Sequence, residues 1–185
     1  MLTTLPALSP FSPLSVILSD VQKSIEGHLY YPALLVALTI PEICSALSLD
    51  KTTFVKEKHY VAFIDKYTTP LDLGIAGLDC FRLRGGMVHR ANLSGHAHFP
   101  TDSVIFTVPE TGIALHGPIF DVSGRTAMVI DLVLFCKEMT AAVHRWYEDH
   151  HNDPKVEQNM KNLIRSCPAG LAPFVVGAPL IASGS

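Results

Sequence analysis

The apolar stretch YPALLVALTIPEICSAL, residues 31–47, constrains the fold more than any other part of the sequence. Pro32 suits the first turn of a helix, and apolar side chains then follow on nearly every side of it, past Pro41, which we expect to kink or end the helix locally. A helix without a polar face belongs in the centre of a bundle. Its apolar run is shorter than the roughly 20 residues of a membrane span, so we expect a core helix, a cytoplasmic protein and no membrane association.

Other segments repeat apolar residues at steps of three and four, which is the spacing of an amphipathic helix. This pattern is present in residues 14–29, 52–67, 76–93, 125–149 and 153–164. Asp153 followed by Pro154 marks the start of the last segment, because Asp caps a helix N-terminus and Pro fits its first position. The sequence therefore predicts about five or six helices.

One segment, SVIFTVPETGIALHG, changes from the helical period to two β-rich runs around a Pro–Gly turn, which predicts a small hairpin near 103–116. The predicted fold class is mainly all-α: a helical bundle with this hairpin inserted. We expect an irregular lead-in over residues 1–13, a single domain over 14–165, and an apolar tail rich in Gly, Pro and Ala over 166–185.

The charge and the cysteines narrow the function classes. The net charge is −3, so no global basic field points to nucleic acid, and a nucleic-acid site has to be local. The four cysteines form no CxxC pair, and Cys44, Cys80 and Cys136 lie within apolar runs. We interpret these cysteines as free and buried, in a reducing compartment.

The nonapeptide RLRGGMVHR, residues 82–90, concentrates cationic side chains in a chain with only 17% charged residues. Around a regular helix, Arg84 and His89 stand about 140° apart, whereas Arg82 and His89 are nearly in line. Arg82 is then the better partner of His89 on one face. Arg84 becomes the better partner if the glycines distort the helix or a second subunit completes the site.

Two adjacent glycines inside a helix need a reason, because each costs about 1 kcal/mol relative to alanine. We expect Gly85 on the core-facing stripe, where a small residue permits close packing, and Gly86 near the Arg–His face, where it admits a partner. The predicted stripe consists of Leu78, Phe81, Gly85 and Val88.

An arginine and a histidine together suffice for metal-independent RNA cleavage. The guanidinium stabilises charge on a phosphate, and the imidazole moves a proton at neutral pH. The simpler alternative is a solvated face on which Asp79 pairs with Arg82 three residues later.

The R-x4-H spacing on a late helix of such a bundle resembles the signature of the HEPN superfamily, the higher eukaryotes and prokaryotes nucleotide-binding domain. The stretches YYPALLVALTIPEICSAL, HYVAFIDKY and LDCFRLRGGMVHR also look like an uncharacterised group of small bacterial proteins, over about residues 14–165. The resemblance implies a helical homodimer in which Arg84 and His89 are catalytic and Glu42 is an acidic residue near the site. Gly85 departs from the polar residue that often follows the motif arginine.

The functions that follow from this resemblance differ in class. One is a metal-independent endoribonuclease of a bacterial toxin or phage-defence system, with RNA or a nucleotide and an antitoxin protein as partners. The alternative is a catalytically silent HEPN-like binding module or a helical dimeric scaffold. Candidate binding residues besides Glu42 are Arg82, Arg90, His96 and His98.

His96 and His98 form the pattern His-x-His, which binds zinc from one face of a strand when further ligands join. No acidic residue or cysteine stands at a diagnostic spacing from them. We therefore predict no metal and no cofactor, and we place these two histidines near the Arg–His site as RNA contacts.

Overall fold

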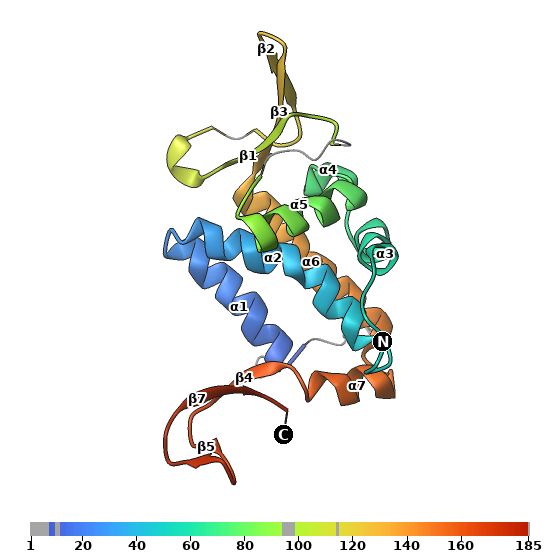
Figure 1. Ribbon diagram of the computed structural model, residues 1–185, viewed down its shortest axis with the longest axis vertical. Coiled ribbons are helices and arrows are strands. Elements are labelled where there is room, and N and C mark those ends of the chain that lie inside the picture. Colours follow the sequence, from blue (N-terminus) through green and yellow to red (C-terminus); the bar gives the residue numbers. More distant parts are fainter. Residues whose placement is uncertain (1–7, 10–11, 94–98, 114, 185) are drawn as a thin grey trace, which may run out of the picture.

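The computed structural model describes residues 8–9, 12–93, 99–113 and 115–184. Figure 1 shows a helical body with a small sheet at one end and an extended C-terminal ribbon at the other. The protein is 53% helical, with 17% strand in three small sheets among the described residues. The prediction of a mainly all-α bundle is therefore wrong, and the chain is a mixed α/β protein.

The helical body contains the α-helices of the described residues. They are α1 (Pro13–Glu26), α2 (Tyr30–Leu47), α3 (Glu57–Tyr67), α4 (Pro70–Leu73), α5 (Gly77–Arg90), α6 (Leu132–His150) and α7 (Pro154–Met160).

The helix starts follow ordinary capping chemistry. The Asp131 side chain accepts a hydrogen bond from the Leu134 N–H at 2.9 Å and so begins α6. Asp153 accepts from the Lys155 N–H at 2.8 Å at the start of α7, which confirms the predicted cap. The third helix begins at Glu57, five residues after the start predicted from its apolar pattern.

Helix α2 is the centre of the body, as its sequence predicts, and it contacts α1, α3, α5, α6 and α7. Pro41 is buried inside the helix and does not end it. Among the described residues α2 is also the one helix long and apolar enough to cross a membrane by length and composition, a property it shares with core helices of soluble proteins. Its packing on five neighbours makes it the core helix here.

The sheet at the end of the body, called the end sheet below, contains β1 (Ser103–Thr107), β2 (Ile119–Val122) and β3 (Arg125–Asp131), in the order β1-β3-β2. The predicted hairpin over 103–116 is wrong. Strand β1 runs parallel to β3, and Pro109–Thr111 is a short 3₁₀ helix, η1, instead of a hairpin turn. The true hairpin joins β2 to β3.

The β2–β3 turn explains a second error, the expected start of a long helix directly after Gly124. Ser123 and Gly124 have φ of 55° and 76°, the left-handed pair that a two-residue hairpin turn needs. The apolar run that follows is strand as far as Asp131 and helix after it. A continuous apolar run is compatible with a buried strand and with a buried helix, and the helix cap at Asp131 marks the boundary between the two.

The C-terminal ribbon, residues 164–184, contains β4 (Ile164–Cys167), β5 (Gly170–Leu171), β6 (Val175–Val176) and β7 (Leu180–Ser183). Strand β4 pairs with β7 and β5 with β6, both antiparallel. The segment predicted as an apolar tail is thus a folded ribbon that begins against α1 and extends away from the body (Figure 1).

All four cysteines are free and buried, as predicted. Burial raises the pKa of the Cys80 and Cys136 thiols to about 12, and it raises that of Cys44 further. The thiols therefore stay protonated and act as small apolar groups of the core.

Candidate functional site

Helix α5 carries the cationic nonapeptide and is regular through both glycines. Its buried side chains include Cys80, Leu83 and Met87, and Gly86 is buried with them. A Cβ on Gly86 would lie 2.7 Å from the Asn92 carbonyl oxygen, while a Cβ on Gly85 would meet nothing within 4 Å. The expected roles of the two glycines are therefore reversed: Gly86 permits the close packing, and Gly85 is the open position.

Arg84 and Glu42, predicted as site residues 42 positions apart, come together between α5 and α2. Arg84 Nη2 lies 2.9 Å from Glu42 Oε2, with side-chain exposures of 14% and 36%. The guanidinium also lies over the Phe81 ring, 5.0 Å from its centroid, and its buried Nε has no hydrogen-bond partner. Within one chain, Arg84 is thus held in a half-buried ion pair that joins two helices.

His89 is exposed near the C-terminal end of α5. Because the helix is regular, His89 stands about 140° around the axis from Arg84. One chain therefore does not bring the two predicted catalytic residues together on one face.

Arg82 pairs with Asp79 through Nη1 and Oδ1 at 3.2 Å, as the simpler interpretation of this face predicts. Arg82 and His89 are nearly in line but about 10 Å apart along the axis, too far to grip one phosphate oxygen. Arg90 is exposed at the end of α5. His96 and His98 lie outside the described residues.

His116 has a structural place. Its Nδ1 accepts a hydrogen bond from the Asp131 N–H at 3.2 Å, and its Nε2 donates to the Asp72 carbonyl oxygen at 2.9 Å. The ring lies against Gly74, which has φ of 75° and where a Cβ would come within 2.9 Å of Nε2. No group of three or more His, Cys, Asp or Glu side chains in the described part of the chain could hold a metal ion.

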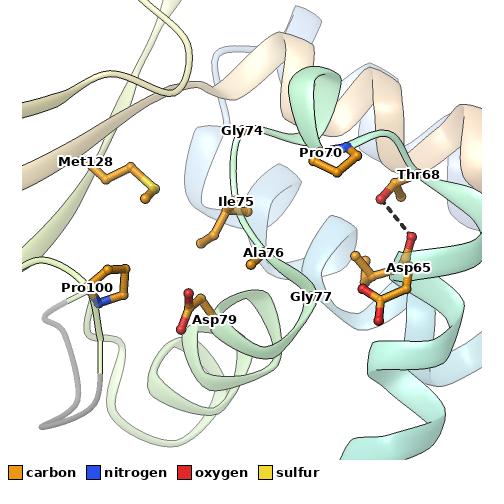
Figure 2. A pocket seen from close by; sticks show the side chains of 11 residues that line it. Asp65, Thr68, Pro70, Gly74, Ile75, Ala76, Gly77, Asp79, Pro100 and Met128 are labelled. Atoms are coloured by element: carbon orange, nitrogen blue, oxygen red, sulfur yellow. Dashed lines mark hydrogen bonds between the residues drawn. The ribbon is translucent and has the colours of Figure 1, made fainter.

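A cavity of about 560 Å³ adjoins the N-terminal end of α5, and sequence reasoning missed it. Figure 2 shows the Asp79 carboxylate directed toward the hollow between Pro100 and Met128, with Asp65 on the opposite side. The Thr68 hydroxyl donates to the Ile64 carbonyl at 2.8 Å, so it offers the cavity an acceptor only. The polar lining is acidic, and the Asp79 carboxylate is already paired with Arg82.

Sequence reasoning also missed a buried ion pair on α6. Glu138 is 7% exposed, and its Oε1 lies 2.7 Å from Arg145 Nη1 and accepts from the Thr69 N–H at 3.0 Å. Arg145 Nη1 donates in addition to the Tyr67 carbonyl at 2.6 Å. The pair fixes the junction of α3 and α4 onto α6. The spacing Glu-x6-Arg, two helical turns, is the signal that could have indicated it.

No family model, curated protein or solved structure matches this chain. The resemblance to the HEPN superfamily stays a prediction from residues 82–90 and the apolar helices around them.

Proposed function

We propose that this protein is a self-associating binding module, in which the end sheet joins two copies. The observation that supports the proposal most is the apolar outer face of that sheet. Exposed side chains on this face are Ile105 (48%), Phe120 (43%) and Val122 (68%). An exposed apolar face of this kind marks an interaction surface.

The strand register separates the two faces of the sheet. Val104 pairs with Met128 on the face that packs on the helical body, where both are buried. Phe120 pairs with Ala127, one position before Met128 in β3, and so points to the opposite face. Ile105, Phe120 and Val122 thus share one face, while β2 is exposed on both faces because the hairpin projects beyond the helical body (Figure 1).

The occupant that fits this surface is a second copy of the chain. Strand β2 is an edge strand, and all four of its residues are exposed. An antiparallel edge can pair with its own two-fold copy, which satisfies the free backbone groups and covers the apolar side chains together.

The test is the molar mass in solution, measured by light scattering after size exclusion, for the wild type, Phe120→Lys and a control. We expect a dimer for the wild type at micromolar concentration and a monomer for Phe120→Lys. The control Phe54→Lys alters an 86%-exposed phenylalanine between α2 and α3 and should remain dimeric. A monomeric wild type, or a dimeric Phe120→Lys, would contradict the proposal.

A second candidate function is a metal-independent endoribonuclease with a site shared by two copies. The observation in its favour is the convergence of Glu42 on Arg84, whose buried Nε has no partner. His89 of a second copy would then have to face Arg84. The RNA 2′-hydroxyl would attack phosphorus and lose its proton to a base, while the 5′-oxygen leaves with a proton.

This candidate is tested by incubating structured RNA with the protein in excess chelator. We expect cleavage by the wild type and by the control His144→Ala, whose histidine is exposed on α6, and none by His89→Ala. Intact RNA with the wild type removes the nuclease candidate. Equal cleavage by His89→Ala removes His89 as its catalyst.

A further inference from the structure

The tip of the C-terminal ribbon, residues 170–177, exposes large apolar side chains to solvent. It consists of the β5–β6 hairpin, on which Phe174 is 81% and Val176 75% exposed. Figure 1 shows this hairpin at the outer end of the ribbon, at the opposite end of the molecule from the end sheet. The tip is therefore an apolar surface separate from the proposed dimer surface.

The apolar side chains of the tip lie on both faces of the hairpin. Val175 and Val176 are consecutive residues of β6, and consecutive side chains of a strand point to opposite faces. Both are exposed, so the helical body covers neither face of β6. A flat protein surface would cover only one of these faces. An apolar medium that surrounds the hairpin, such as the acyl region of a bilayer, covers both faces together.

The ribbon carries almost no charge. Residues 166–185 include no Asp, Glu, Lys, Arg or His. Arg165 lies in β4 at the base of the ribbon, where its Nη2 donates to the Gly184 carbonyl oxygen at 2.8 Å. The β2–β3 hairpin of the end sheet differs, because it carries the exposed Asp121 and Arg125. Since charges are expensive to transfer into a bilayer, lipid suits the ribbon and protein suits the end sheet.

The backbone of the tip also suits an apolar medium. The Phe174 N–H donates to the Leu171 carbonyl oxygen at 3.0 Å, and the Gly177 N–H donates to the Ala169 carbonyl oxygen at 2.9 Å. Pro173, inside the turn, has no N–H to satisfy. Backbone groups that are paired within an inserted segment avoid much of the cost of leaving water.

A protein partner that adds a strand to the ribbon fits it less well. Strands β4 and β7 have 4 residues each, and β5 and β6 have 2 each. Pro168 directly follows β4, Pro173 separates β5 from β6, and Pro179 directly precedes β7. Short edge strands and prolines are features that prevent edge-to-edge pairing.

We propose that the tip of the C-terminal ribbon inserts into the interface of a phospholipid bilayer and attaches the protein peripherally to a membrane surface. Phe174 and Val176 enter the boundary between headgroups and acyl chains, while the helical body stays in water. Helix α2, whose length led us to expect no membrane association, takes no part in this contact. One short hairpin covers little apolar area, so the binding is reversible.

The first measurement is flotation of the wild type with phosphatidylcholine vesicles, at low salt and at about 0.5 M sodium chloride. We expect the protein to float with the vesicles in both conditions, because salt screens charges and does not weaken the burial of apolar groups. A protein that stays at the bottom of the gradient, or one that salt releases from the vesicles, would overturn the proposal.

A double substitution, Phe174→Ser with Val176→Ser, locates the contact. Both side chains are exposed, so the variant should fold like the wild type, which circular dichroism checks. Its partition onto vesicles should be at least about tenfold weaker, since it lacks two apolar side chains that lipid would cover. Phe54→Ser removes a similarly exposed ring between α2 and α3 and should float like the wild type. A folded double variant that floats normally places the contact elsewhere, and the proposal fails.

The molar mass without lipid distinguishes a bilayer from a second copy as the occupant of the tip. The double variant should have the mass of the wild type, and a lower mass would assign the tip to self-association and overturn the proposal. Phe120→Lys, which alters the end sheet, should still float with vesicles. Failure of the proposed dimer and failure of lipid binding are therefore seen in different measurements.

Discussion

The helical body and the C-terminal ribbon have similarly apolar sequences, but they bury them very differently. Helix α6 places seven apolar residues in the core, among them Phe135 and Trp146. The ribbon exposes most of its large apolar side chains, including Phe174, Val176 and Ile181. Apolar content alone therefore does not say what a segment contributes to stability. The contribution to stability depends on whether the apolar side chains of the segment pack against another element of the same chain.

The end sheet is intermediate between these two regions. One face joins the core through Phe106, whose ring meets Phe135 edge to face with centroids 5.5 Å apart. The other face exposes Ile105, Phe120 and Val122, although Val129 on the same face is buried. The end sheet is thus anchored on one side and open on the other. A contact made through the open side can form and break without unfolding the helical body.

The largest effect that would separate body from ribbon is expected from paired phenylalanine substitutions. Phe135→Ala should lower the free energy of unfolding by about 3–5 kcal/mol, because it leaves a cavity where α6 meets the sheet. Phe174→Ala removes an exposed ring from the ribbon and should change it by less than about 0.5 kcal/mol. Urea unfolding followed by circular dichroism measures both. Equal losses would show that the ribbon carries stability like the body does.

A smaller effect is expected at the buried ion pair of α6. Glu138→Ala leaves Arg145 and the Thr69 N–H without their carboxylate and should cost about 2 kcal/mol, less than a fully buried pair because Arg145 is half exposed. Glu148→Ala, at an exposed position of the same helix, is the matched control and should be nearly neutral. Thermal unfolding measures the difference, and equal shifts in the two variants would remove the assigned role of Glu138.

The ion pair between α2 and α5 should matter less again. Glu42→Gln retains the size of the side chain and an acceptor but loses the charge, so we expect a loss of about 1 kcal/mol in the free energy of unfolding. Glu148→Gln, at an exposed position of α6 away from a helix N-terminus, serves as its control. An unchanged stability in Glu42→Gln would mean that Arg84 is not held by charge, and the guanidinium would then be free for a ligand.

The smallest expected effect is a pH dependence of the local stability at the contact between the helical body and η1. The Tyr30 hydroxyl and His28 both hydrogen-bond Glu110, and the Tyr30 donor is the main cause that lowers the pKa of this exposed carboxyl. Since the folded pKa lies below the unfolded value, this contact stabilises the protein above the unfolded pKa and is lost as pH falls through the folded one. In wild type, the protection of backbone amides near η1 against hydrogen exchange should fall as this contact is lost at low pH. In Tyr30→Phe this fall should be smaller. An unchanged exchange profile below about pH 4 would contradict this contact.

Much of the helical body could be predicted from the sequence. The helical period located α1, α2 and α5, and capping chemistry placed the start of α7 at Asp153. The end sheet could not be predicted, because β1 pairs with a strand 24 residues later in the sequence. The residue pattern of β1 does not indicate which strand it pairs with. The two β-rich runs around Pro109 favoured a local hairpin, whereas the left-handed turn at Ser123 and Gly124 determines the real one.

The candidate site was predictable only in part. The ion pair of Arg84 with Glu42 joins two residues that the sequence selected, and the pair of Arg82 with Asp79 follows from their spacing. The glycine roles were reversed because the predicted core stripe was rotated around α5: Cys80 and Leu83 are buried instead of Phe81 and Val88.

The parallel pairing of β1 with β3 has a consequence for how the chain is made. During synthesis β1 leaves the ribosome before its partner exists, and the β2–β3 hairpin comes later. The hairpin closes locally and can form first, while β1 has to wait with Val104 and Phe106 uncovered. We expect the last step of folding to be the insertion of β1 beside an already formed hairpin, at the moment when α6 supplies Phe135 as its support.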